Sequence, residues 1–239
     1  MLTGSVPPTG PVWNEKSETR LSNRLLMSLP AHEYQGLRPY LKPINVSAGQ
    51  RLHRQDELLE DVFFPAHRCV CSVTLSTSDG GTVQVVNIGS EGFVGTNVVW
   101  GGRHATGDVT IHLAVAPFLR ALEGGTLFSN AVTTYVDAAV KALMKNVACN
   151  AMHSAEQRCS RWLLETADRA VATQLRLTQD YMAAMLGVRR PTVTLACSAL
   201  QKAGAISYQR RIVTILDRRR LEAAACGCYE APVESAAVA

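Results

Sequence analysis

Residues 177–194, LTQDYMAAMLGVRRPTVT, contain the most informative local pattern of the chain. Thr178 is a suitable N-cap for a short helix, and Asp180 lies in its first turn, where the helix dipole favours a carboxylate. Gly187 can adopt the left-handed conformation that ends a helix, and Pro191 suits the first turn of the next one. We therefore predict two helices joined by a tight turn, with adjacent arginines at the start of the second. This pattern is typical of a helix-turn-helix whose second helix enters the DNA major groove.

The charge distribution indicates a polyanionic partner for the C-terminal third of the chain. Residues 176–220 contain nine basic and two acidic residues, whereas all 239 residues together have a formal net charge of +4. The remainder is therefore slightly acidic. Such a local basic excess favours double-stranded DNA as the partner of this region.

Composition and cysteine usage restrict the class of protein. No apolar run approaches the roughly 18 residues of a membrane span, and no secretory leader is found, so we expect a cytoplasmic protein without membrane association. Seven cysteines without framework spacing are expected to be reduced thiols. Cys226 and Cys228 have a C-x-C spacing, tighter than the usual C-x-x-C, which favours a packed or oxidation-prone thiol pair. We expect no metal and no cofactor.

Residues 44–119 consist of short β-type segments separated by turns. The segments cover 62–64, 69–75, 82–88 and 109–113, and residues 78–81 (SDGG) are a strong hairpin signal. Their even spacing predicts a jelly-roll of the double-stranded β-helix type. Before it, residues 17–43 predict a helical lead-in that is interrupted at Pro30, and residues 1–14 predict a loose tail.

A long helix is predicted from about residue 126, with apolar residues at intervals of three and four. The apolar stripe could pack on the chain's own β domain. Because it is narrow and flanked by small residues, we favour a seam against a second copy. The expected homodimer interface comprises Val132, Val136, Ala139, Leu143 and Val147.

The remaining C-terminal pattern predicts a winged helix. Further helix is expected from Ser154 to about Arg169, before the two helices described above. After them, β-type residues 206–208 and 212–216 flank Gln209, Arg210 and Arg211, which predicts a hairpin with a basic tip.

Taken in order, these parts resemble the Crp/Fnr superfamily of bacterial transcription regulators. The resemblance runs from about Asn23 to Tyr229 and is closest over residues 177–200, with the MLGVRRPTV core of one subgroup. It continues in VFFP (62–65), GSEGFVG (89–95), RCSRWLL (158–164) and CGCY (226–229). It implies an α+β fold with flexible tails at 1–14 and 230–239, a double-stranded β-helix sensor domain at 15–125, a dimerisation helix at 126–152 and a winged helix-turn-helix at 153–229.

The resemblance also implies DNA-binding roles. Arg190 would contact guanine O6 and N7, and RNA polymerase would be a protein partner. Pro191 and Leu195 stand where the family has a glutamate and a later arginine, so the target sequence of the cyclic-AMP receptor is not expected. The other DNA-binding candidates, mainly phosphate contacts, are Thr178, Gln179, Arg189, Thr192, Thr194, Arg210 and Arg211.

The same resemblance locates a candidate effector pocket. Family members hold the ribose with the glutamate of a Gly-Glu pair and the phosphate with an arginine. This chain has Gly95 and Thr96, and Arg103 lies about two residues early. We therefore expect a degenerate pocket around these residues and an effector that the sequence does not identify. The alternative is a cyclic-nucleotide-responsive regulator with an altered phosphate pocket.

Other chemistries lack the necessary residues. An oxygen-sensing iron–sulfur cluster would need four thiolates. The resemblance implies that most of them would lie in the N-terminal arm, but no cysteine precedes Cys69. A cupin-type metal oxygenase would need a His-x-His pair, and the candidate histidines, which are His53, His67, His104 and His112, are scattered. With no nucleophile–base pattern or phosphate-binding loop, no catalytic residue is expected and the chain is predicted not to be an enzyme.

Overall fold

The computed structural model describes residues 23–44, 51, 53–66, 69–100, 113–123 and 125–230, with the side chains of 113–116 left undescribed. The predicted tail at 1–14, residues 231–239 of the other tail, Arg103 and residues 109–112 of the last expected strand lie outside these ranges. Three of the candidate histidines, His67, His104 and His112, lie outside them too. Within the described part, no helix is long and apolar enough to cross a membrane.

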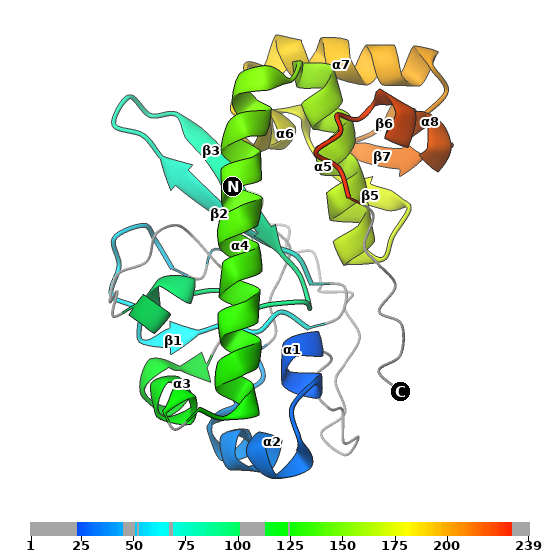
Figure 1. The fold of residues 1–239 in the computed structure, drawn as a ribbon. Helices are drawn as coiled ribbons and strands as arrows, with labels where there is room; N and C mark the ends of the chain where they lie inside the picture. Colours follow the sequence, from blue (N-terminus) through cyan, green and yellow to red (C-terminus); the bar gives the residue numbers. More distant parts are fainter. Residues whose placement is uncertain are drawn as a thin grey trace, which may run out of the picture.

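The N-terminal part combines short helices with antiparallel strand pairs (Figure 1). The lead-in breaks at Pro30 as predicted, because this residue is the N-cap of the second helix. The β2–β3 pair confirms the predicted hairpin, with a turn at residues 77–81 in which Thr77 N donates to Gly81 O at 2.8 Å. The elements are α1 (Arg24–Met27), α2 (Ala31–Leu37), η1 (Arg38–Tyr40), β1 (Asp61–Val62), β2 (Cys71–Ser76), β3 (Thr82–Ile88), η2 (Thr96–Trp100), β4 (Leu113–Ala114) and α3 (Val115–Leu122).

The predicted β domain is present but not closed in the residues described. Its strands form two separate pairs there, β1 with β4 and β2 with β3. An aromatic core holds the domain together, with the rings of Phe64, Phe93, Phe118 and Phe128 at centroid distances between 5.1 and 6.2 Å. These rings are almost completely buried, so their removal from water is a main source of stability for this part.

The long helix α4 (Leu127–Met152) starts where the sequence predicts, because the Thr126 side chain caps it by accepting from Ser129 N at 3.1 Å. Val132 and Val136 are buried in the aromatic core of the same chain. Within one chain, these two residues of the predicted dimer seam are therefore already covered by its own core. Ala139 and Leu143 are half-buried, whereas Val147 is 72% exposed.

The C-terminal part is a helical unit with a small three-stranded sheet of order β5-β7-β6. A capping box between Ser154 and Gln157 fixes the start of its first helix, and the predicted wing is the β6–β7 hairpin. Strand β5 and helix α8 were not anticipated from the sequence. The elements are α5 (Ala155–Ala170), β5 (Gln174–Arg176), α6 (Gln179–Leu186), α7 (Arg190–Lys202), β6 (Ile206–Gln209), β7 (Ile212–Ile215) and α8 (Arg218–Ala224).

The two parts are joined by polar contacts between the β2–β3 hairpin region and α5. Trp162 Nε1 donates to Gln84 Oε1 at 2.8 Å, and Arg169 Nε pairs with Glu91 Oε1 at 2.9 Å. The ring of Trp162 also lies 6.2 Å from that of Tyr181 in α6. The hairpin therefore fixes the orientation of the helix-turn-helix relative to the β domain.

Candidate nucleic-acid interface

The first helix of the predicted helix-turn-helix forms for the local reasons given by its sequence. Thr178 Oγ1 accepts a hydrogen bond from Tyr181 N at 3.0 Å, and Asp180 lies in the first turn. Gly187 ends the helix in the left-handed conformation, with φ of 61° and ψ of 38°. These three features confirm the predicted cap, first turn and tight turn.

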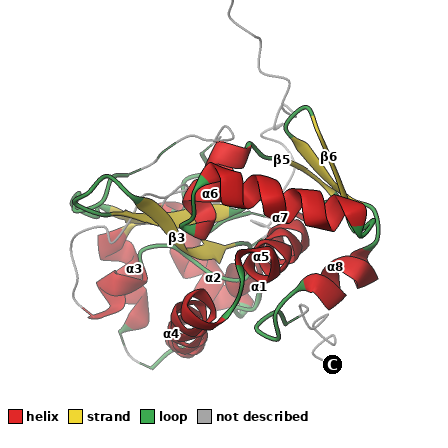
Figure 2. Cartoon of the chain, turned by 90° about the horizontal axis from the view of Figure 1, so that it is seen from above, coloured by secondary structure: helices red, strands yellow, loops and turns green. Residues whose placement is uncertain are grey.

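Helix α7 presents one face to the core and the other to solvent. It begins at Arg190, with Arg189 at the N-cap position and Pro191 in the first turn. Figure 2 shows α7 lying across the top of the molecule, over α5. The core-facing side chains are Val193, Ala196, Cys197 and Leu200, and the exposed residues at its N-terminal end are Arg189, Arg190, Pro191, Thr194 and Leu195.

Polar side chains of both helices meet at the N-terminal end of α7. Thr194 Oγ1 donates to Gln179 Oε1 at 2.9 Å, and Arg190 Nε lies 3.6 Å from Asp180 Oδ1. The Arg190 and Asp180 side chains are both more than half exposed, and such surface pairs contribute about 0–1 kcal/mol. Arg190 can therefore leave its carboxylate for another acceptor at little cost.

The wing has an unusual turn. Gln209 pairs with Ile212, so only Arg210 and Arg211 connect β6 to β7. Both arginines have positive φ, 49° and 66°, as a type I′ hairpin turn requires. Asn and Gly are the residues usually found there, because a side chain with a Cβ is strained in this conformation. The strained positions hold two exposed cations at the tip of the hairpin.

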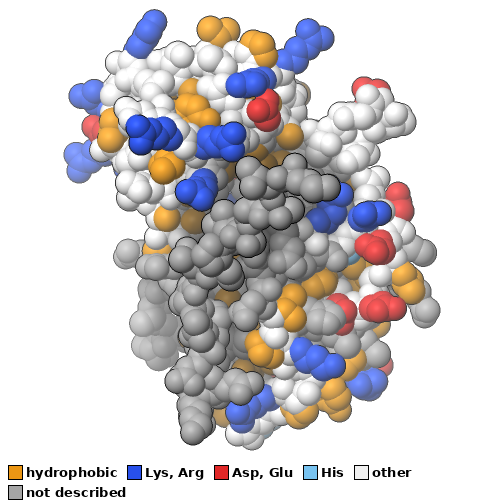
Figure 3. Space-filling model, turned by 180° about the vertical axis from the view of Figure 1, so that it is seen from behind, with side chains coloured by type: hydrophobic (Ala, Val, Ile, Leu, Met, Phe, Trp, Pro, Cys, Tyr) orange, Lys and Arg blue, Asp and Glu red, His pale blue; other side chains and the backbone are white. Residues whose placement is uncertain are grey.

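The surface charge follows the division of the chain. Lys and Arg side chains are the main charged groups on the upper part of the molecule in Figure 3, over the C-terminal elements. On the lower part, carboxylates are interspersed with them. The basic excess of residues 176–220 thus lies on the same end of the molecule as α7.

This geometry agrees with the family comparison. Residues 157–224 match the family model of the Crp-like helix-turn-helix domain. The C-terminal part of the chain is therefore similar to a Crp-like helix-turn-helix domain. No curated protein matches the chain significantly.

Solved structures extend the similarity of fold beyond the Crp-like domain to most of the chain. The c-di-GMP responsive global regulator CLP of Xanthomonas campestris has a TM-score of 0.65 and 12% identity, covering 79% of this chain and 100% of its own. A CRP-family transcriptional regulator of Thermus thermophilus has a TM-score of 0.60 and 16% identity, and the match covers 76% of this chain and 99% of that protein. FixK2 of Bradyrhizobium japonicum has a TM-score of 0.56 and 18% identity, and the match covers 74% of this chain and 93% of FixK2. The predicted α+β fold class is confirmed.

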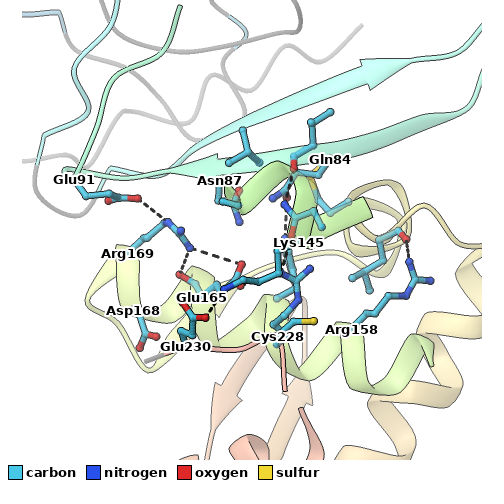
Figure 4. Close-up of a pocket in the computed structure, with 18 of the residues that line it drawn as sticks. Gln84, Asn87, Glu91, Lys145, Arg158, Glu165, Asp168, Arg169, Cys228 and Glu230 are labelled. Atoms are coloured by element: carbon cyan, nitrogen blue, oxygen red, sulfur yellow. Dashed lines mark hydrogen bonds and ion pairs between the residues drawn. The ribbon is translucent and has the colours of Figure 1, made fainter. Parts of the chain in front are cut away.

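The predicted effector pocket lies only partly in the described region. Gly95 approaches Val62 closely, and Thr96 opens the η2 helix. A different cavity, of about 430 Å³, lies between β3, α4, α5 and the C-terminal segment (Figure 4). Three of its cations, Lys145, Arg161 and Arg169, are paired with carboxylates, as in the Arg161–Glu165 contact of 3.0 Å. Arg158 instead donates to Asn150 Oδ1 and to Leu186 O. An anionic ligand at any of the three paired cations would have to displace a carboxylate.

Sequence reasoning missed a cluster of metal-ligand side chains at the end of α4. Cys149, His153, Cys226 and Cys228 offer ligand atoms that all lie within 4.8 Å of one another. Burial raises the pKa of the Cys149 thiol to about 12, and the Arg161 guanidinium opposes this shift. The signal available in the sequence was the C-x3-H pair at 149–153, which is separated from the C-x-C pair by 72 intervening residues.

Proposed function

We propose that the chain is a sequence-specific transcription regulator that binds double-stranded DNA as a homodimer at an inverted-repeat site. The exposed, basic N-terminal end of α7 is the observation on which this proposal depends. A helix-turn-helix inserts this end of its second helix into the major groove. RNA polymerase is the expected protein partner.

Within this proposal, the exposed residues divide by what they contact. Arg190 forms a bidentate contact to guanine O6 and N7, and Leu195, which is 72% exposed, packs against a thymine methyl group. Arg210 and Arg211 contact phosphates from the wing, where their strained backbone conformation is retained for function. The phosphate contacts of the helix-turn-helix are made by Thr178, Gln179, Arg189, Thr192 and Thr194.

The homodimer uses the C-terminal half of α4. Val140, Met144, Val147 and Ala151 follow one another at intervals of three and four and so share one face of the helix. Met144 and Val147 are 68% and 72% exposed. The helix lies at the front of the molecule in Figure 1, with no described element covering it. A two-fold pair of such helices places two α7 helices about one DNA turn apart, which requires an inverted repeat.

The test compares Arg190→Ala with Arg189→Ala against DNA sites substituted at every half-site position and at several salt concentrations. Arg190→Ala should cost about 1–3 kcal/mol per half-site and relax the preference at one symmetric position. Arg189→Ala should weaken specific and non-specific sites alike and flatten the salt dependence, because fewer counterions are released.

The matched control is Arg38→Ala, which changes the exposed arginine at the C-cap of α2 and should bind DNA like the wild type. Helix α2 lies at the opposite end of the molecule from α7 in Figure 1. Uniform weakening by Arg190→Ala, with base preferences unchanged, contradicts its role as a base contact. If neither variant at the start of α7 changes binding, the proposed interface is wrong.

A further inference from the structure

Two segments far apart in the sequence bring four potential metal ligands together. Cys149 lies in the last turn of α4 and His153 is its C-cap, whereas Cys226 and Cys228 follow α8. Cys149 Sγ lies 3.5 Å from Cys226 Sγ, and Cys228 Sγ lies 3.6 Å from His153 Nδ1. Each segment therefore contributes two ligands.

The distances fit a single tetrahedral ion. Zinc–thiolate bonds of about 2.3 Å at the tetrahedral angle separate two sulfur atoms by about 3.8 Å. The Cys149–Cys226 sulfur distance of 3.5 Å and the distance of 3.6 Å from Cys228 Sγ to His153 Nδ1 are within a few tenths of an ångström of this separation. All four ligand atoms lie within 4.8 Å of one another. Only small side-chain adjustments are needed to close the coordination shell.

The chemistry of the four ligand side chains indicates which metal would bind. Three thiolates and one imidazole are the Cys3His set of structural zinc sites, and soft sulfur ligands disfavour magnesium and calcium. With the imidazole neutral, this set around Zn²⁺ has a net charge of −1. Arg161, whose guanidinium interacts with Cys149, supplies positive charge nearby. Cys149 and Cys226 are almost fully buried, which protects the site from solvent.

The segment that carries Cys226 and Cys228 is held in place by other contacts. The Tyr229 hydroxyl donates to Asp168 Oδ2 of α5 at 2.7 Å, and Arg218 Nη1 donates to Asp168 Oδ1 at 2.6 Å. Glu230 forms an ion pair with Lys145 of α4. These contacts orient the C-x-C pair towards the end of α4 before any metal binds.

We propose that Cys149, His153, Cys226 and Cys228 bind one zinc ion, which fastens the end of α4 to the C-terminal end of the helix-turn-helix domain. All four coordination positions are filled by protein, so the site is structural. Binding converts the three thiols to thiolates and releases their protons to solvent. The cluster contains none of the arginines proposed to contact DNA, so the zinc proposal can be tested independently of the proposed function.

The experiment measures zinc in the full chain, purified under reducing conditions and supplied with one equivalent of Zn²⁺ before desalting. We expect about one ion per chain in the wild type and in Cys69→Ser, a control thiol in the β domain that is outside the cluster. Cys228→Ser and His153→Asn should each weaken zinc binding by more than about 100-fold, because even loss of an outer-shell partner costs about 10–100-fold.

Two readouts on the unmodified chain keep the test informative if the variants fail to fold. Titration with Co²⁺ should give the thiolate-to-metal charge-transfer absorption of a tetrahedral cobalt site, and a chelator should lower the melting temperature of the zinc-loaded protein. A wild type that retains no metal and shows no cobalt absorption overturns the proposal. So does a Cys149–Cys226 disulfide in the purified protein with zinc absent, which would assign the cluster to thiol chemistry.

Discussion

At the scale of single residues, the wing combines a strained backbone with two exposed positive charges. Arg210 and Arg211 both occupy the left-handed region, where a residue with a Cβ costs about 1–2 kcal/mol. Strained backbone of this kind gathers at functional sites, because a stable fold tolerates it there. Under the proposed function, the strain positions two cations at the tip of a rigid hairpin.

The double variant Arg210→Asn with Arg211→Gly tests this trade-off. Asn and Gly suit a type I′ turn, so the free energy of unfolding should rise by about 1–2 kcal/mol. In the proposed homodimer this variant removes four phosphate contacts, two from each wing, which should reduce the slope of log affinity against log salt by about 3.6. Denaturant unfolding and binding measurements at several salt concentrations give the two quantities.

The control for the wing is Arg38→Asn, which removes an exposed arginine from a residue with φ of −49°. It should leave both the stability and the salt slope near their wild-type values. A double wing variant that is more stable but binds DNA with an unchanged salt slope would show that the wing does not contact phosphates.

Gly92 illustrates a second constraint at the residue scale. A Cβ placed on it would lie 1.9 Å from the ring of Tyr135, which itself packs on Phe93 with a centroid distance of 5.3 Å. We expect Gly92→Ala to destabilise the chain by about 1–3 kcal/mol through overpacking. The comparison is Gly36→Ala in helix α2, where no atom lies within 4 Å and a gain of about 0.5–1 kcal/mol is expected. Equal melting temperatures of the two variants would contradict this argument.

At the scale of elements, α4 divides into two halves that its sequence does not distinguish. The apolar period is the same along the helix, but Val132 and Val136 pack on the chain's own aromatic core. Met144 and Val147 are uncovered. The spacing of apolar residues shows which face of a helix is apolar, but it does not show what covers that face. The predicted dimer seam therefore included Val132 and Val136, which the single chain already buries.

A charge on the uncovered half of α4 should break the homodimer. Met144→Glu or Val147→Glu would place a carboxylate in an apolar interface, where it has no partner. We expect the dimer dissociation constant to rise by at least about tenfold, or ~1.4 kcal/mol. Analytical ultracentrifugation measures it, with Thr134→Glu, exposed elsewhere on the same helix, as the control. A wild type that is monomeric at micromolar concentration would contradict the proposed assembly.

At the scale of the whole molecule, local signals and long-range contacts differ in how far sequence could predict them. The helix-turn-helix depends on caps and a turn within a few residues, such as Thr178 and Gly187, and these were predicted correctly. The cluster of Cys149 and Cys226 depends on the return of the chain after 77 residues. The residue spacing within either segment alone could not predict this cluster. Strand β5 was missed for the same reason, because its pairing partner β7 lies far along the chain.

The last prediction concerns the effector and involves both parts of the molecule. Cyclic AMP at millimolar concentration should change neither the melting temperature nor the DNA affinity. The family that the chain resembles holds the ribose 2′-hydroxyl with a carboxylate, and Thr96 at the matching position offers only a neutral hydroxyl, which is a weaker acceptor. The cavity between the two parts offers no unpaired charge on Arg161 or Arg169, because Glu165 and Glu91 already neutralise them.

The measurement is thermal unfolding with and without the nucleotide, repeated with cyclic GMP and cyclic di-GMP. A ligand present at about 100 times its dissociation constant adds roughly 2.7 kcal/mol to the stability of the folded state, so specific binding would be plain in the melting temperature. An inverted-repeat DNA site selected by the protein serves as the positive control. A clear rise with a cyclic nucleotide would favour the alternative regulator with an altered phosphate pocket. If the Thr96→Ala variant kept that rise, the ligand would bind without any contribution from the Thr96 hydroxyl.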